Sequence, residues 1–435
     1  MQVSVEKTSE LRRKMTVSIP DAIVQEKMDS RLKSLAREVK VAGFRPGKVP
    51  ANIVKKLYGD RIKGEITGDL IESTYFEALR QENLNPAGHP QIHPSDENGD
   101  GFEYIAEFEV LPEISLDVVN RLQIINPSAE ITESDLENML VKLRIQKRTW
   151  QEVERDSQSG DLVTINFSGT SEGENFTNGK AENSKIEIGG RQMIPGFEEA
   201  LLGLSTGAVK KFSATFPEQY HNTKLAGKAA EFEIEVVKVE EPVLPEINVE
   251  FIQSYGVESG DLETFRNEVK ANMERELQQT LKTRLKNNVF DNLYEQIALA
   301  LPKVMIDIEI EKMLQPLAAQ AQKEHFNPQD IELPESLEAQ AERRVALGLI
   351  LSEIVKQNQL KIDAQKVRSF ITELSKSYET PEEVINWYYA DQNRLNEVQQ
   401  MVLEDQAVDW VLSQAQVTTQ SLSFSEVMDK QQIEV

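Results

Sequence analysis

An apolar stripe between Phe265 and Leu293 places the strongest constraint on how this chain folds. Apolar residues occupy every fourth position along it: Phe265, Val269, Met273, Leu277, Leu281, Leu285, Val289 and Leu293. Because an α-helix turns once in 3.6 residues, the stripe drifts slowly around a helix of about forty residues. A coiled-coil seam requires a spacing of 3.5. The pattern therefore favours an elongated arm that packs on short neighbouring helices.

The rest of the chain after Pro245 also has a helical pattern and is rich in Gln, Glu and Leu. Its aromatic residues, Trp387, Tyr388 and Trp410, are assigned mostly to the core. The polar end of the chain, 418–435, is expected to be partly disordered. Further helices are predicted at 340–357, 364–378, 381–390 and 393–413.

Residues 150–245, called the β module below, show short runs in which apolar and polar residues alternate. Gly-rich turns separate the runs, and one brief helical stretch follows Pro195-Gly196. Alternation with a period of two is typical of strands, so we expect a compact, mostly antiparallel β domain with one short helix. The alternating runs lie at 161–169, 184–189, 208–216 and 229–240.

Residues 1–112 mix both periods, which predicts an α+β domain with helices at 20–40 and 61–83. Between these helices, residues 43–50 read Gly-Phe-Arg-Pro-Gly-Lys-Val-Pro. Two prolines and two glycines in this stretch exclude a helix or a central strand. We expect this segment, called the 43–50 loop below, to be exposed.

A bridge at 113–149 connects this domain to the β module. It combines an extended, proline-containing stretch with a helix whose start carries Thr132 and Asp135 in a capping pattern. The predicted fold class is therefore multidomain α+β. Its parts are an α+β domain at 1–112, the bridge, an antiparallel β domain at 150–245 and an elongated all-α domain at 246–435.

Charge is distributed unevenly along the chain. Lys and Arg number 48 and Asp and Glu number 73, a net charge of −25, yet residues 1–64 hold 15 basic and 7 acidic residues. This distribution argues against a nucleic-acid binder along the whole chain and makes the region of the 43–50 loop the basic patch. Two interpretations follow. The loop is an ordinary turn on a charged surface, or it presents Phe44, Arg45 and Lys48 to a partner with acidic side chains or phosphates.

Several classes of site lack support in the sequence. The absence of cysteine excludes disulfides, thiolate metal ligands and thiol nucleophiles. His89 and His93 lie in a Pro-rich loop without an HExxH pattern, and no GxxxxGK[ST], GxGxxG or GxSxG motif occurs. We therefore expect no metal and no cofactor.

The sequence also bears on cellular location. The first twenty residues lack the apolar run of a secretory signal. The longest apolar run, 345–351, is far below the ~20 residues of a membrane span. These two observations predict a soluble cytoplasmic protein.

The 43–50 loop within a basic α+β domain resembles the signature of the bacterial trigger factor family, chaperones that dock beside the ribosomal exit tunnel. Three C-terminal stretches extend the resemblance to nearly the full length: 301–310, 343–351 and 403–408. It implies binding to the large ribosomal subunit, through a ribosomal protein or rRNA. Many relatives have Lys where this chain has Pro46, so one cation of the loop is missing. The implied ribosome-binding residues are Gly43, Phe44, Arg45, Pro46, Gly47 and Lys48.

The β module is similar to the FK506-binding-protein (FKBP) family of peptidyl-prolyl isomerases. The matching motifs are the run 160–169, Phe176, the run 193–198, the run 216–220 and Phe232. The resemblance implies an aromatic basin that binds proline, whereas alternating aromatic residues by themselves equally suit the core of a small sheet. The implied catalytic residues are Phe167, Phe176, Met193, Ile194, Phe197, Tyr220 and Phe232.

Such a basin needs no nucleophile, metal or cofactor. An X–Pro bond isomerises over a barrier of about 18–20 kcal/mol that originates in amide resonance. An apolar pocket that removes water from this bond and favours its twisted geometry lowers the barrier. Two residues depart from single-domain relatives: Thr177 replaces an aspartate, and Phe197 stands where tryptophan is common.

The two resemblances together imply a ribosome-associated chaperone that binds nascent and unfolded polypeptides, isomerises X–Pro bonds and assists folding and export. They imply no membrane partner, and they allow a homodimer off the ribosome. The helical region would offer an adaptable apolar surface without a residue motif. Two alternatives stay open: a free cytosolic isomerase-holdase without ribosome docking, and an interaction scaffold whose β module is inactive because of Thr177 and Phe197.

Overall fold

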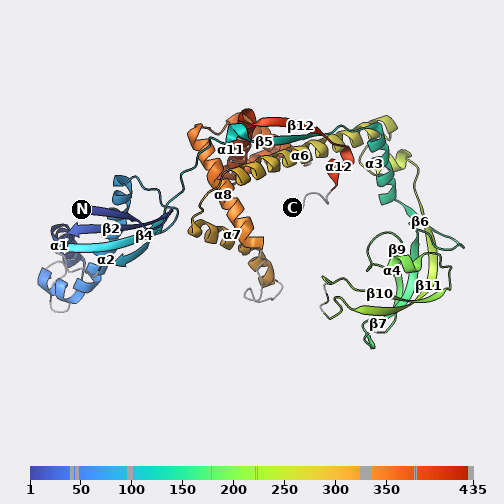
Figure 1. Ribbon diagram of the computed structural model, residues 1–435, viewed down its shortest axis with the longest axis horizontal. Helices are drawn as coiled ribbons and strands as arrows, with labels where there is room; N and C mark the ends of the chain where they lie inside the picture. Colours follow the sequence, from blue (N-terminus) through green and yellow to red (C-terminus); the bar gives the residue numbers. More distant parts are fainter. Residues whose placement is uncertain are drawn as a thin grey trace. The chain divides into compact units, whose positions relative to one another are not determined.

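The computed structural model describes residues 1–39, 44, 49–95, 101–177, 179–220, 222, 224–323, 336–376, 378 and 380–429. The chain forms two compact units (Figure 1). The first comprises Met1–Pro127 and Thr283–Gln420, and the second comprises Ser128–Lys282 and Ser421–Val435. Within the described ranges we find no helix with enough length and apolar character to span a bilayer.

The N-terminal part of the first unit is a four-stranded antiparallel sheet with two helices beside it (Figure 1). Alternate residues of the second strand, Met15, Val17 and Ile19, are buried in one cluster with Leu32 and Val54 from the helices. The α+β prediction for this region is confirmed. In pairing order the strands are β1 Gln2–Lys7, β2 Arg12–Pro20, β4 Gly101–Glu109 and β3 Gln91–Pro94, and the helices are α1 Asp21–Glu38 and α2 Ala51–Gln81.

Helix α2 begins earlier than the expected start at 61. Pro50 precedes its first residue, and the fixed φ of proline suits the beginning of a helix. Val54 in the first turn is fully buried in the N-terminal core, so packing stabilises this turn. Among residues 52–60, whose burial is described, Val54 is the only buried apolar residue, which is why the sequence pattern does not reveal this part of the helix.

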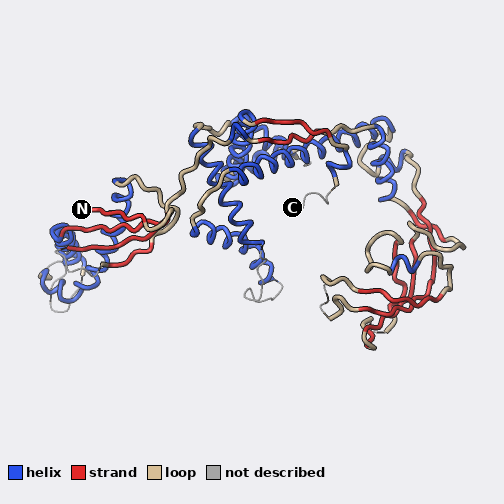
Figure 2. Tube along the Cα trace, viewed as in Figure 1, coloured by secondary structure: helices blue, strands red, loops and turns tan. Residues whose placement is uncertain are grey.

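The remaining elements of the first unit are mostly helices, and the predicted helices are confirmed to within a few residues. One strand, β12, is an addition to the all-α expectation for 246–435, and it pairs with β5 in the part of the bridge that was expected to be extended (Figure 2). Ile124 of β5 is fully buried beside Ile350 and Val411, and Trp410 packs partly buried against the same cluster. The elements are η1 Val119–Arg121, β5 Gln123–Ser128, α7 Lys303–Lys323, α8 Ser336–Gln357, α9 Ala364–Ser375, α10 Pro381–Tyr389, α11 Gln392–Gln414 and β12 Gln416–Ser421.

Trp387 is the exception to the expectation that most of the aromatic residues after Pro245 belong to the core. Helix α10 has no buried residue, and Trp387 is 53% exposed. Its neighbour Tyr388 instead packs against the small cluster formed by α9 and α11. The guanidinium of Arg394 stacks over the indole 3.9 Å from its centre, and its Nη1 donates a hydrogen bond to the Trp387 carbonyl oxygen at 2.6 Å. A cation therefore covers this ring instead of a core.

The stripe on α6, Leu262–Gln296, is distributed over two hydrophobic clusters. In the second unit, Phe265 and Met273 are buried with residues of α3 Glu133–Gln146, α5 Val249–Gln253 and α12 Phe424–Met428. In the first unit, Val289 and Leu293 are buried with residues of α8 and α11. The cluster in the second unit includes the short helices α5 and α12, as the drifting stripe predicted. In the first unit the expectation of short neighbours is wrong, because α8 and α11 have 22 and 23 residues. The start of α3 carries the expected cap, because Thr132 and Asp135 bond reciprocally.

The polar end of the chain is ordered as far as it is described, so the expectation of disorder is wrong for 418–429. These residues complete β12 and form α12. Ser423 and Glu426 cap α12 reciprocally, and Phe424 and Val427 are buried. The Ser-x-x-Glu spacing is the sequence signal that indicates this helix. Residues 430–435 lie outside the described part of the chain.

The β module is an antiparallel sheet with one short helix, as its alternating runs predicted. Its main path pairs β10, β11, β7 and β8 in that order, and β9 pairs with β7. The first strand pairs with the end of the last, with Thr149 opposite Val243. The elements are β6 Thr149–Glu152, β7 Leu162–Ser171, β8 Glu174–Asn175, β9 Ala181–Glu187, α4 Phe197–Leu201, β10 Val209–Thr215 and β11 Ala229–Val243.

Candidate functional site

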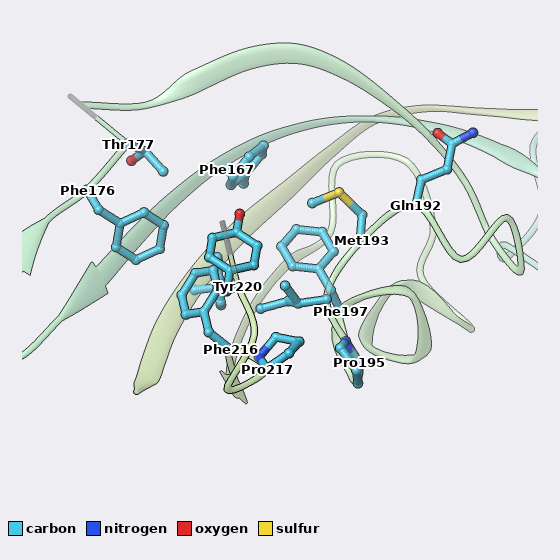
Figure 3. A pocket seen from close by; sticks show the side chains of 12 residues that line it. Phe167, Phe176, Thr177, Gln192, Met193, Pro195, Phe197, Phe216, Pro217 and Tyr220 are labelled. Atoms are coloured by element: carbon cyan, nitrogen blue, oxygen red, sulfur yellow. The ribbon is translucent and has the colours of Figure 1, made fainter. Parts of the chain in front are cut away.

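An aromatic cavity of about 490 Å³ opens in the β module. Phe167 comes from β7, Phe197 from α4 and Phe232 from β11, whereas the other contributors lie in the connecting loops. In Figure 3, Phe176 and Thr177 lie at one end of the cavity and Gln192 lies at the other. All seven residues that the resemblance implied line this one cavity: Phe167, Phe176, Met193, Ile194, Phe197, Tyr220 and Phe232.

Phe197 forms the centre of the aromatic packing. Its side chain is fully buried at the start of α4, directly after Gly196, whose φ of 88° turns the chain into the helix. Its ring meets those of Phe167, Phe212 and Phe232 edge to face, with centroids 5.6, 5.2 and 5.1 Å apart. These contacts hold the ring in one orientation below the cavity.

Phe176 forms one wall, and a glycine makes room for it. Its ring packs edge to face on Phe216 and Phe232 at 5.5 and 5.7 Å. A Cβ atom on Gly169 would lie 2.3 Å from the Cζ atom of Phe176. Because real Cβ contacts are never so short, any side chain at 169 would displace the ring.

Thr177, at the position of an aspartate in single-domain relatives, belongs to a local hydrogen-bond network. Its Oγ1 accepts a hydrogen bond from the Gly169 backbone N–H at 3.3 Å and lies 2.7 Å from the Gly179 carbonyl oxygen. None of the described residues that line the cavity is acidic or basic. The described lining of the cavity is therefore mostly apolar and carries no charge.

The residues that sequence reasoning missed lie between or beside the predicted ones. Phe216 and Pro217 stand in the Phe-Pro-Glu-Gln-Tyr motif itself, which could have indicated them. Gln192 precedes the Met-Ile-Pro motif by one position and had no signal of its own. The additional lining residues are Thr177, Gln192, Pro195, Phe216 and Pro217.

Glu198 holds the loop that carries Met193 and Ile194. Its carboxylate is almost fully buried and accepts four backbone N–H groups, from Gly189 and Arg191 on Oε2 and from Gln192 and Met193 on Oε1, at 2.8–3.2 Å. Burial raises the pKa of Glu198, but the four donors outweigh it and hold the pKa below its ordinary value. Glu198 is therefore a positioning residue for one wall of the cavity.

Replacing Glu198 by glutamine is expected to destabilise the β module by about 2 kcal/mol, because the amide NH₂ cannot accept two of the four backbone N–H groups. Since the folded pKa is lowered, the ionised carboxylate stabilises the wild type above the unfolded pKa. This contribution is lost as the pH falls below about 4.3. Urea denaturation between about pH 7 and pH 3 measures this. Equal pH slopes for wild type and Glu198→Gln would contradict the assignment.

The 43–50 loop is described only in part. Phe44 is 40% exposed, and Val49 is buried in the N-terminal core just before Pro50 precedes α2. Exposed cations follow on α2, among them Lys55, Lys56, Arg61 and Lys63. The other predicted docking residues, Gly43, Arg45, Pro46, Gly47 and Lys48, lie outside the described residues.

Among the residues that the structure describes, we find no group of His, Asp and Glu arranged to hold a metal ion. The helices after Pro245 carry large apolar side chains that are exposed. They include Leu262, Ile308, Leu374, Trp387, Tyr389 and Met401.

Known proteins match this chain along nearly its whole length. Residues 1–143 match the family model "Bacterial trigger factor protein (TF)", and 261–413 match "Bacterial trigger factor protein (TF) C-terminus". The trigger factor of Stutzerimonas stutzeri (strain A1501) is 44% identical over 98% of both chains. The chain belongs to the trigger factor family. The trigger factor of Pseudomonas putida (strain GB-1) is likewise 44% identical over 98% of both chains.

The β module matches a separate family model, "FKBP-type peptidyl-prolyl cis-trans isomerase", over residues 153–237. A solved structure described as "Promiscuous Substrate Recognition in Folding and Assembly Activities of the Trigger Factor Chaperone" is 18% identical, with a TM-score of 0.49, and covers 95% of this chain and 99% of that one. As a member of this family, the chain is a ribosome-associated chaperone with a peptidyl-prolyl cis-trans isomerase domain. Nothing in these comparisons supports a free isomerase without ribosome docking.

Proposed function

We propose that the aromatic cavity of the β module binds the prolyl ring of an X–Pro bond and is the catalytic site. The observation that carries this proposal is that all seven residues implied by the FKBP resemblance line one cavity without a charged side chain. Phe197 would form the floor under the prolyl ring, and Phe176 and Tyr220 would form walls. Together with Phe167, Met193, Ile194 and Phe232, they would exclude water from the X–Pro amide and favour its twisted geometry.

The proposed division of labour follows the sequence-based domains. Residues 1–112 would dock on the ribosome, and 150–245 would isomerise X–Pro bonds. Residues 113–149 and 246–435 would form the chaperone body that shields nascent and unfolded polypeptides and assists their folding and export. We further propose that the protein acts in the cytoplasm and forms a homodimer off the ribosome, where the exposed apolar helical side chains would be partly covered.

Docking would use the 43–50 loop against the large ribosomal subunit at the exit tunnel. Two observations support this. Phe44 is an exposed aromatic residue, and residues 1–64 carry the excess of basic residues in an otherwise acidic chain. Phe44, Arg45 and Lys48 would be the anchors, held by Gly43, Pro46 and Gly47. Exposed aromatic and arginine side chains are typical of residues that dominate binding energy.

A Phe44→Ala, Arg45→Ala, Pro46→Ala triple variant is expected to bind ribosomes at least about tenfold more weakly than wild type. Co-sedimentation with ribosomes at near-physiological salt measures this. A matched control is Phe76→Ala, Arg80→Ala, which removes an exposed aromatic residue and an exposed cation from the part of α2 outside the basic region. If wild type does not co-sediment, or if the triple variant and the control bind equally, the proposed docking mode is lost.

A further inference from the structure

A second apolar cavity lies between α3 and α6, outside the β module. It has a volume of about 240 Å³ and is floored by Met139, Leu143, Tyr255, Phe265 and Met273. This is below the ~300–1,000 Å³ of a typical small-molecule site, so it suits a side chain better than a cofactor. Methionine is flexible and polarizable, and two methionines can adapt to apolar side chains of different shape.

The rim of this cavity is negative. Glu268, Asn272 and Glu276 line it from successive turns of α6, and all three are exposed. No Lys or Arg lies three or four residues from Glu268 or Glu276 on the helix, so neither carboxylate has a local partner. By contrast, Arg266 on the same helix pairs with both Glu133 and Glu137.

Two cations lie at the cavity, and each contacts an uncharged residue that lines it. Lys147 lies over the ring of Tyr255, with Nζ 5.4 Å from the ring centre, and Arg275 donates to the Asn272 side chain at 3.0 Å. Within the described part of the chain, neither Glu268 nor Glu276 forms an ion pair. An incoming cation would therefore meet two unneutralised carboxylates beside an apolar hollow.

We propose that this cavity binds a Leu or Met side chain of an unfolded polypeptide segment, with a Lys or Arg of the same segment against Glu268 and Glu276. The proposal rests on the chaperone function. It adds a specific cavity in which one apolar side chain of the bound polypeptide would be held. The negative rim favours a basic segment over the surface of a second copy, because residues 65–435 carry a strongly negative net charge. The apolar floor and the acidic rim together set the two requirements for the segment.

Fluorescence anisotropy with the full chain and labelled unstructured peptides tests this assignment. The probe peptide contains one Leu and one Arg among Gly and Ser. Matched peptides replace Arg by Glu, or Leu by Ser. We expect the Arg peptide to bind about five- to tenfold more tightly than the Glu peptide at low salt, with a smaller difference at high salt.

Two variants locate the effect. E268Q/E276Q removes both rim charges and is expected to abolish the preference for Arg, whereas E263Q/E274Q changes the same charge at exposed positions of α6 outside the cavity. Asn272→Trp covers the mouth and is expected to weaken all three peptides. Asn267→Trp, also exposed on α6 but outside the cavity, is its control. Both controls are expected to bind like wild type.

The possible results distinguish a failure of the cavity assignment from a failure of the proposed chaperone function. If wild type neither binds the peptides nor delays the aggregation of a denatured protein, the chaperone proposal itself falls. If wild type delays aggregation but E268Q/E276Q and Asn272→Trp bind peptides like their controls, only the cavity assignment is overturned. If these variants instead change self-association in sedimentation velocity without changing peptide binding, the cavity serves a second copy of the chain and the proposal is likewise wrong.

Discussion

Replacing Phe197 by alanine is expected to abolish most of the acceleration of proline-limited refolding by this chain. The ring is fully buried beneath the cavity and touches three other aromatic rings. Loss of about 2–3 kcal/mol of apolar contact in the transition state corresponds to about a hundredfold lower kcat/KM. The cavity left behind is also expected to destabilise the β module by about 3–5 kcal/mol. Refolding kinetics of a substrate with a slow X–Pro step measures the first effect, and urea denaturation measures the second.

A second variant keeps this prediction testable if Phe197→Ala does not fold. Phe197→Leu retains most of the apolar volume and is expected to stay folded with a clearly reduced rate. Phe251→Ala is the matched control, because Phe251 is buried in a different cluster and its loss should leave the rate unchanged. If wild type does not accelerate refolding and a folded variant behaves the same, the β module is an inactive scaffold. If wild type accelerates refolding and a folded Phe197→Leu or Phe197→Ala variant does so equally, the cavity is not the catalytic site.

Replacing Gly169 by alanine is expected to lower kcat/KM about tenfold, equivalent to about 1.4 kcal/mol of transition-state stabilisation. The added methyl group would lie 2.3 Å from the Phe176 ring, so the ring must leave its place in the cavity wall. Overpacking of this kind is expected to destabilise the module by about 1–3 kcal/mol. A chymotrypsin-coupled assay with a short X–Pro peptide measures the rate.

The pair Gly169 and Phe176 offers an internal control by a double-mutant cycle. Phe176→Leu alone should lower the rate, and Gly169→Ala added to it should cost little more, because the clash has been removed. Gly348→Ala, where an added Cβ meets nothing within 4 Å, should leave activity unchanged and stabilise α8 by about 0.5–1 kcal/mol, because glycine is unfavourable inside a helix. Independent, additive effects of the two substitutions at 169 and 176 would show that the glycine does not act through the ring.

The spacing of apolar residues predicted the helices and strands well, because the face of an element that is buried determines where its apolar residues occur. The alternation in β7 and β11 and the four-residue stripe on α6 both correspond to faces that are buried in the structure. Trp387 shows the limit of the method. An aromatic residue on a short helix is assigned to a core by its type alone, whereas Arg394 stacks on it at the surface.

The sequence predicted those residues of the candidate site that belong to a recognisable motif. It did not predict residues whose role depends on how the folded backbone is arranged around them. Phe167, Phe197 and Phe232 were identified because aromatic residues recur in order. The role of Glu198 was missed because a glutamate in the first turn of a helix is usually exposed there, favoured by the helix dipole. Only the folded loop brings four backbone N–H groups to its carboxylate.

Because its first and last strands pair, the β module begins and ends at adjacent positions, as an inserted domain does. Thr149 and Val243 are opposite each other in an antiparallel ladder, where partner Cα atoms lie about 4.5–5.5 Å apart. A gene can gain or lose the sequence between them while the flanking polypeptide keeps nearly the same end-to-end distance. The same adjacency allows a circular permutation that opens the module elsewhere and joins these two ends by a short peptide.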